Sequence, residues 1–182
     1  MRVFTVAVAV FWSGLLIAQT MAVNSYQEKQ TAHPDEAKIL IGTWRLVSRS
    51  TVTLDGKPVT DPNLGSTPTG YLVYDSSGHV SAQLMRPDRT MNELTNCGVQ
   101  AGKAADNNSA AVCGYDAYFG TYTLENRFTV AHHLEIAISP ADVGKVIRRT
   151  FQVDGDSLTI SFSTTSPQGQ PLTRKLLWKR VN

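Results

Sequence analysis

From Ile39 onward, the chain is divided into short stretches rich in Val, Ile, Thr, Tyr and Phe, separated by turn residues. Such a pattern is typical of an all-β protein. Eight strands are predicted, over residues 43–54, 69–75, 79–86, 118–125, 128–138, 145–154, 157–165 and 172–180. Because the connections are mostly short and contain turn-forming residues, we expect sequential strands to pair as antiparallel hairpins.

Apolar and polar side chains alternate along these strands, which predicts a sheet with one dry face and one wet face. In the last strand, the residues on one side are Leu172, Arg174, Leu176, Trp178 and Arg180. We therefore predict an eight-stranded antiparallel up-and-down barrel, because closure removes the exposed edges of a sheet. A two-sheet sandwich is the alternative. A barrel of this size is either filled by side chains or holds one small ligand.

One long segment, from Pro87 to Ala117, interrupts the strand pattern. It is too long for a hairpin loop, and two helical stretches are expected in it, at 89–94 and 109–115. The predicted fold therefore carries a short helical insertion between the third and fourth strands. This insertion is a candidate lid, flank or partner surface.

Two cysteines, Cys97 and Cys113, bracket an Ala- and Asn-rich part of that insertion. No second cysteine pair is present to complete a zinc site, so we expect a disulfide. Closing a loop of about 15 residues stabilises a fold by roughly 3 kcal/mol. A catalytic thiol is the alternative reading. Asn107 begins a glycosylation sequon, which has meaning only in a eukaryotic source.

The N-terminus has the outline of a secretory signal peptide, with Arg2, an apolar stretch from Val3 to Ala18, and small residues at Thr20 and Ala22. A membrane anchor is the alternative, but polar residues interrupt a stretch already shorter than the ~20 residues of a span. We expect 1–22 to be removed, 23–37 to form a flexible leader, and 38–182 to form the barrel domain. The mature protein is then secreted or periplasmic, with no stable membrane span.

The net charge of +2 excludes a strongly basic protein. Binding to nucleic acid needs a clustered surplus of Lys and Arg, so no nucleic-acid partner is expected. Motifs that would indicate other chemistry are absent from the sequence, including G-x-S-x-G, H-E-x-x-H, C-x-x-C and a phosphate-binding glycine loop. We accordingly expect no cofactor and no metal site.

Gly42-Thr43-Trp44, at the start of the first strand, resembles the G-x-W signature of lipocalins, in which the tryptophan plugs one end of the barrel. The resemblance continues through residues 70–74, 78–83, 117–122, 130–135, 155–160 and 177–180. Together these segments resemble the small single-domain lipocalin-like family of bacteria and fungi. The resemblance implies a calyx for a small hydrophobic or amphipathic molecule, and a structural role for Gly42 and for Arg180, which is expected to pack on Trp44. It implies no ligand identity and no catalytic residues.

Two histidines and a glutamate lie on the predicted fifth strand. Adjacent residues of a strand face opposite ways, so His132 shares the apolar side with Leu134 and Ile136. His133 and Glu135 share the other side. An inward His132 either binds a ligand or is a core histidine that a neighbouring Tyr or Ser satisfies. Adjacent histidines on a strand cannot converge on one ion, which disfavours a metal site.

The remaining candidate ligand-binding residues are four tyrosines, whose rings suit a small-molecule pocket, and one arginine: Tyr71, Tyr74, Tyr118, Tyr122 and Arg148. Ordinary sheet packing is the alternative for each tyrosine. Arg148 and its neighbour Arg149 point to opposite faces of the sixth strand, and whichever faces inward needs an anionic partner. Glu135 is the candidate partner for an arginine that faces solvent.

Three functions remain open from the sequence. The first is an exported protein that binds a small hydrophobic or amphipathic ligand inside the barrel. The second is an isomerase, cyclase or dehydratase in which His132 and a pocket tyrosine act as acid and base. The third is an interaction module whose working surface is the disulfide-closed insertion.

Overall fold

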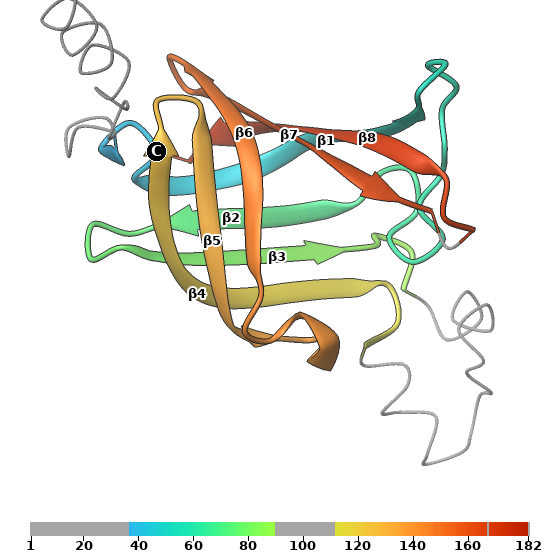
Figure 1. The fold of residues 1–182 in the computed structure, drawn as a ribbon, viewed down its shortest axis with the longest axis horizontal. Coiled ribbons are helices and arrows are strands. Elements are labelled where there is room, and N and C mark those ends of the chain that lie inside the picture. The colour runs from blue at the N-terminus through green and yellow to red at the C-terminus, as the bar shows by residue number, and fades with distance from the viewer. Residues whose placement is uncertain (1–36, 90–111, 167, 182) are drawn as a thin grey trace, which may run out of the picture. The chain divides into compact units, whose positions relative to one another are not determined.

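Eight antiparallel strands close into a barrel, each pairing with its neighbours in sequence, and β8 returns to pair with β1 (Figure 1). This computed structural model describes residues 37–89, 112–166 and 168–181. The strands are β1 (Gly42–Thr53), β2 (Thr69–Tyr74), β3 (His79–Met85), β4 (Tyr115–Asn126), β5 (Thr129–Ala137), β6 (Val146–Asp154), β7 (Ser157–Thr165) and β8 (Pro171–Arg180). A short 3-10 helix, η2 (Pro140–Asp142), lies between β5 and β6. The predicted all-β, up-and-down barrel is confirmed.

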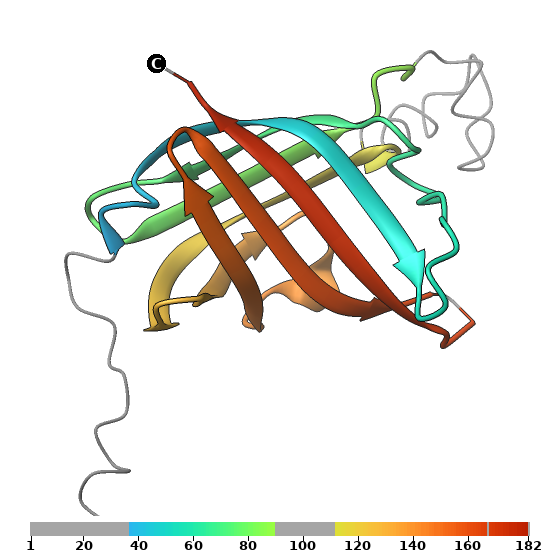
Figure 2. The same cartoon turned by 90° about the horizontal axis from the view of Figure 1, so that it is seen from above.

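The closure of the sheet depends on β8, which lies between β1 and β7 (Figure 2). Its pairing with β1 extends from Trp44 opposite Arg180 to Thr53 opposite Leu172. Because both edges of the sheet are used in this pairing, no strand of the described barrel is left as a free edge. The alternative of a two-sheet sandwich is therefore wrong.

One end of the barrel is plugged by Trp44, which is fully buried. Its indole Nε1 donates a 2.8 Å hydrogen bond to the carbonyl oxygen of Leu40, in the turn before β1. The guanidinium of Arg180 lies over the indole, 4.0 Å from the ring centroid, which is the packing that the lipocalin resemblance implied. The same guanidinium donates to the carbonyl oxygens of Ile41 and Ile39, at 2.5 and 2.9 Å. Arg180 thereby ties the last strand to the chain that enters the first.

A β-bulge in β1 changes which of its side chains point into the barrel. The register against β8 shifts between Leu46 and Ser48, so one extra residue, Val47, is inserted. Before the bulge the inward residues are even-numbered, as for Leu46; after it they are odd-numbered, and the side chain of Arg49 is only 3% exposed. The bulge thus brings an arginine inside.

A second irregularity, between β4 and β5, corrects one sequence expectation. The register shifts between Phe119 and Gly120, and beyond it Ile136 lies on the outer surface, 66% exposed, although strict alternation placed it inside. Gly120 is required at this point because any Cβ would collide with the backbone carbonyl of His133.

The predicted helical insertion is not shown. Residues 90–111 lie outside the described residues, and with them Cys97, Asn107, most of the stretch 89–94 and the first three residues of the stretch 109–115. Where the description resumes, Cys113 is in a turn and Tyr115 already belongs to β4, ahead of the predicted start of that strand. The disulfide and the sequon therefore stay predictions. So do the signal peptide and the leader, because residues 1–36 also lie outside the described residues. Within the described ranges, no helix is long and apolar enough to cross a bilayer.

Replacing Arg180 tests its role at the plugged end. Arg180→Met keeps the apolar stem but removes the charge that packs on Trp44 and binds two carbonyl groups. We expect the free energy of unfolding to fall by about 2 kcal/mol in urea titrations. Lys179→Met is the matched control, because Lys179 is exposed on the other face of β8 and should change stability by less than about 0.5 kcal/mol. Equal effects of the two substitutions would show that Arg180 has no special role.

Candidate functional site

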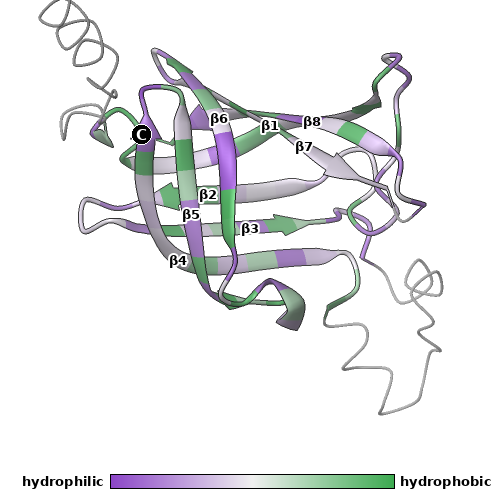
Figure 3. Ribbon diagram, viewed as in Figure 1, coloured by the Kyte–Doolittle hydropathy of each residue, from purple (hydrophilic) through white to green (hydrophobic). Residues whose placement is uncertain are grey.

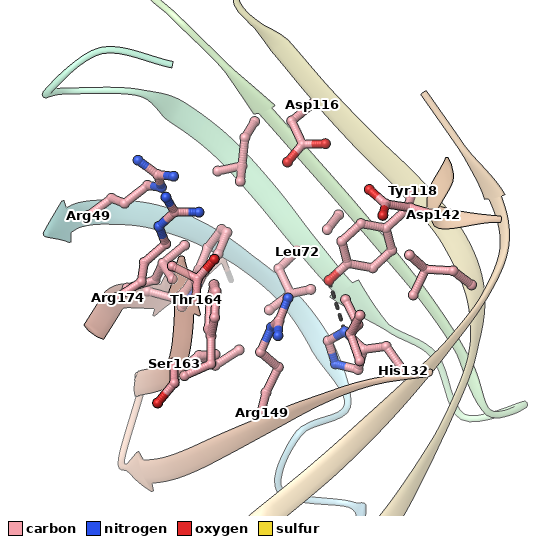
Figure 4. A pocket seen from close by; sticks show the side chains of 18 residues that line it. Arg49, Leu72, Asp116, Tyr118, His132, Asp142, Arg149, Ser163, Thr164 and Arg174 are labelled. Atoms are coloured by element: carbon pink, nitrogen blue, oxygen red, sulfur yellow. Dashed lines mark hydrogen bonds between the residues drawn. The ribbon is translucent and has the colours of Figure 1, made fainter. Parts of the chain in front are cut away.

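A cavity of about 340 Å³ lies inside the barrel, lined by residues from all eight strands and from η2 (Figure 4). Ligand pockets typically have volumes of about 300–1,000 Å³, so this one suits a single small molecule. It occupies the end of β1 and β8 that is remote from the Trp44–Arg180 pair, since Arg49 and Arg174 line it. The interior is therefore solid at one end and hollow at the other.

The apolar part of the cavity wall comes from six strands, β2, β3 and β5–β8. It includes Leu72, Leu84, Leu134, Ile147, Ile160 and Leu176. Trp178 also lines the cavity, and its indole Nε1 is buried without a hydrogen-bond partner among the described residues. A buried N–H without an acceptor is unfavourable, and an oxygen atom of an occupant would remove that cost.

His132 is held between two tyrosine hydroxyls at the base of the cavity. Its Nε2 lies 2.8 Å from the hydroxyl of Tyr74. Its Nδ1 lies 2.8 Å from the hydroxyl of Tyr118, and Figure 4 draws this second hydrogen bond. His132 and Tyr74 are each 1% exposed, whereas Tyr118 lines the cavity. His132 is thus a core histidine satisfied by tyrosines, and it also reaches the cavity surface.

Burial keeps the His132 imidazole uncharged. Desolvation, together with the nearby positive charge of Arg149, lowers the pKa of His132 to about 3. Desolvation also raises the pKa of both tyrosines, so their phenols stay protonated. The three rings form a neutral hydrogen-bonded row at physiological pH.

The direction of the two hydrogen bonds follows from Tyr74. In the described part of the chain its hydroxyl has one partner, Nε2 of His132, and burial denies it water. The Tyr74 hydroxyl therefore donates to Nε2, because the opposite direction would leave a buried proton without an acceptor. The ring proton of His132 must then be on Nδ1, and this N–H donates a hydrogen bond to the hydroxyl oxygen of Tyr118. The proton of Tyr118 is left to donate into the cavity.

Tyr122 does not line this cavity. Its ring packs edge-on against Tyr74, with centroids 4.9 Å apart, and its hydroxyl donates a 3.1 Å hydrogen bond to the carbonyl oxygen of Asp75. Tyr74 likewise lies behind His132 instead of in the wall. Of the four predicted tyrosines, only Tyr118 forms part of the cavity surface.

Two arginines at the cavity rim share one carboxylate. Oδ2 of Asp61 accepts hydrogen bonds from Arg49 at 2.7 Å and from Arg174 at 3.0 Å. Burial would raise the pKa of Asp61, but the backbone N–H of Leu64 and the Arg49 side chain outweigh this effect and the pKa is lowered. This group of three carries a net positive charge and fixes the loop containing Asp61 against β1 and β8.

A third arginine, Arg149, lines the cavity from β6. Its guanidinium lies 3.6 Å from the centroid of the Phe162 ring. Figure 3 shows a hydrophilic section in the middle of β6. Arg148 and Arg149 are the two adjacent arginines of that strand. Burial lowers the pKa of Arg149, although from a value so high that the group stays charged.

Two aspartates face the cavity from the side occupied by β4 and η2. Asp142 is paired with Lys145 at 2.8 Å. Asp116 has neither a hydrogen bond nor an ion pair with any described residue, and burial, followed by repulsion from Asp142, raises its pKa. Figure 4 shows these carboxylates on one side of the pocket and Arg49 and Arg174 on the other.

Besides Tyr74 and Tyr122, two further predicted ligand-binding residues, Tyr71 and Arg148, lie outside the cavity, and this corrects the sequence expectation. Tyr71 is 49% exposed, because it is three residues from the inward Tyr74 and so faces the opposite side of β2. Arg148 is exposed and pairs with Glu125 at 2.8 Å, so Arg149 is the inward member of the pair. The suggested partner Glu135 is not used, because Ala131 and not Glu135 lies opposite Arg148 in the β5–β6 register.

Sequence reasoning missed several cavity residues. The alternation in β8 placed Arg174 on the same side as Leu176, but the sequence analysis assigned no role to Arg174. Arg49 was hidden by the bulge at Val47, which nothing in the sequence marks. Asp116 fell in the presumed insertion. His133 lies on the outer face, where its Nε2 is 2.9 Å from the Thr123 hydroxyl.

No group of three or more His, Cys, Asp or Glu side chains suited to a metal ion occurs in the described ranges. A family model for a lipocalin-like domain matches residues 41–181, a range that contains every strand of the barrel. No curated protein matches the chain.

The neutral state of His132 has a consequence for stability. The unfolded chain binds a proton at this residue below about pH 6.5, whereas the folded protein does so only near pH 3. The contribution of His132 to stability is complete above pH 6.5 and is lost as the pH falls. Between pH 6 and 4, the free energy of unfolding should decrease by about 1 kcal/mol per pH unit more in the wild type than in His132→Gln.

The adjacent surface residue supplies the control for that experiment. His133→Gln should keep the wild-type pH dependence, because His133 lies on the outer face. Nitrogen-15 NMR of the wild type should independently show a neutral His132 with its proton on Nδ1 from pH 7 to 5. A charged ring or the Nε2–H tautomer would contradict the assigned hydrogen-bond directions.

Proposed function

This chain belongs to the lipocalin-like domain family, and we propose that it is an exported protein whose barrel binds one small amphipathic molecule carrying an oxygen acceptor. The observation that carries this proposal is the Tyr118 hydroxyl, which His132 holds so that its proton points into a cavity of about 340 Å³. A ligand carbonyl or carboxylate oxygen is the natural acceptor for that proton. The apolar body of the ligand would contact Leu72, Ile160 and Leu176.

Two further features support an oxygen-bearing ligand over a plain hydrocarbon. Nε1 of Trp178 is a buried donor without a described acceptor, and Trp178 lines the same cavity. The guanidinium of Arg149 provides additional N–H donors. Tyr118, Trp178 and Arg149 thus all present donors to the cavity for which the described residues provide no acceptor there, and a ligand that accepts hydrogen bonds would pair with them.

Export is proposed from the sequence alone. The apolar stretch from Val3 to Ala18, followed by small residues before Val23, has the form of a cleavable signal peptide. Cleavage after Ala22 would make Val23 the first residue of the exported protein, which N-terminal sequencing reads directly. An oxidising compartment would also favour the predicted bond between Cys97 and Cys113.

An isomerase, cyclase or dehydratase is the second candidate function, favoured by the presence of Tyr118 and Asp116 in one cavity. Both nitrogens of His132 are occupied by tyrosine hydroxyls, so His132 acts on a ligand only by positioning Tyr118. Tyr118, with its raised pKa, suits the role of hydrogen-bond donor to a carbonyl oxygen. Asp116, whose raised pKa makes its carboxylate a stronger base than usual, would exchange the proton.

Filling the cavity tests the binding proposal. Leu84→Trp, on β3, places an indole inside the barrel, whereas Met85→Trp, one residue further, places it on the outer surface, where Met85 is 37% exposed. The probe is the neutral, environment-sensitive dye N-phenylnaphthylamine, whose emission rises on binding. We expect Leu84→Trp to weaken its binding at least about tenfold and Met85→Trp to leave it within about twofold. No binding by the wild type, or equal loss in both variants, would refute a ligand site in the barrel.

The enzymatic alternative predicts proton exchange on a bound ketone. In heavy water, the wild type should accelerate deuterium incorporation next to the carbonyl of β-tetralone, as followed by proton NMR. Asp116→Asn and Tyr118→Phe should each reduce that acceleration about 100-fold, since each removes one of the two proton-handling groups. Arg148→Gln, a change on the outer surface, should have no effect. Exchange that is no faster than in buffer would leave binding as the function.

A further inference from the structure

Arg149 is a cationic group inside the barrel that no carboxylate of the described chain pairs with. Its one hydrogen bond is local, from Nη1 to the carbonyl oxygen of Arg148 at 3.2 Å, and no ion pair is formed. The neighbouring Arg148, by contrast, faces outward and pairs with Glu125. Of the two adjacent arginines, the inward one is therefore the one without an ion-pair partner in the described part of the chain.

The surroundings of Arg149 hold the guanidinium in place without neutralising it. The Phe162 ring covers one face at 3.6 Å, and the same ring lies 5.8 Å from the guanidinium of Arg174. A cation on an aromatic face gains some stabilisation, but the N–H donors at the edge of the guanidinium remain unused by it. Three groups interact electrostatically with Arg149 so as to favour its charged form. Tyr118 and Tyr74 are neutral phenols, and the third, Asp116, does not approach the guanidinium closely enough to form an ion pair.

The other charged groups of the cavity do not supply the missing anion. Asp61 already forms ion pairs with two arginines, Arg49 and Arg174, so its single negative charge does not neutralise a third. Asp142 is paired with Lys145. Asp116 faces the cavity from β4 but forms no ion pair with a described residue, and burial raises its pKa, which weakens it as an anionic partner. Arg149 therefore has no ion-pair partner among the described residues, and a largely buried cation without one is costly unless an anion binds.

We propose that the ligand of this cavity carries an ionised carboxylate that pairs with the guanidinium of Arg149. This inference rests on the proposed binding function and names the chemical class of the ligand. The planar guanidinium suits a carboxylate because two parallel N–H donors match its two oxygens. The Tyr118 hydroxyl is available to the same group, and the apolar remainder of the ligand would lie on Leu72 and Ile160.

A matched pair of probes separates charge from shape. Naphthylacetate and naphthylacetamide have nearly the same size and both present an oxygen acceptor, but only the acetate is ionised at neutral pH. Dissociation constants are measured by displacement of N-phenylnaphthylamine from the full-length protein. In the wild type, we expect the acetate to bind at least about tenfold more tightly than the amide. Arg149→Gln should abolish that preference by weakening acetate binding, with amide binding unchanged within about twofold.

Arg148→Gln is the matched control, because it removes the adjacent arginine from the outer face and should leave both constants unchanged. Arg149→Lys should retain part of the preference, since it keeps the charge but loses the paired donors. Equal binding of the two probes by the wild type, or an equal effect of Arg148→Gln and Arg149→Gln, overturns the inference. Displacement of the dye by neither probe overturns the carboxylate while leaving ligand binding in place. A wild type that does not bind the dye refutes the proposed function and the inference together.

Discussion

A neutral histidine held between two tyrosine hydroxyls divides the barrel into a packed end and a hollow end. On one side of His132, Tyr74 and the Trp44 plug belong to the buried hydrophobic core. On the other side, Tyr118 faces a cavity. Because a buried hydroxyl needs an acceptor, Tyr74 fixes the histidine tautomer, and the histidine in turn fixes which atom of Tyr118 offers a proton to an occupant. Packing at the closed end thereby sets the chemistry of the open end.

The polar groups of the cavity differ in whether the protein itself satisfies them. Arg49 and Arg174 are compensated by Asp61, and that group of three closes one part of the rim. Arg149 and the Nε1 atom of Trp178 lack such compensation among the described residues. Buried polar groups without partners are costly, and natural proteins retain them mainly where a ligand or a reaction uses them. Because of this distinction, we interpret the cavity as a binding site for an oxygen-bearing molecule and not as a packing defect.

Much of the fold was predictable because a strand repeats its side-chain direction every two residues. All eight strands were found within a few residues of their observed bounds, and His132 was placed on the inner face. The same rule failed where a bulge inserted an extra residue: Arg49 was missed, and Ile136 was put inside when it is 66% exposed. Tyr71 was predicted to line the pocket together with Tyr74, although the same rule places two residues three positions apart on opposite faces of a strand. Glu135 was paired wrongly because the β5–β6 register was not known.

The sequence by itself determined the strand order, the barrel, the family and the residue type at each position that could carry chemistry. These predictions depend on the alternation of side chains along each strand and on the short turns between strands. Both features are visible in the sequence of a single chain. Only the tertiary structure decided that Arg149 and not Arg148 faces inward, that Asp61 joins Arg49 to Arg174, and that Tyr118 and Tyr74 meet on His132. Those contacts join residues that are far apart in the chain, and their positions depend on bulges and strand register, which are set when the sheet closes.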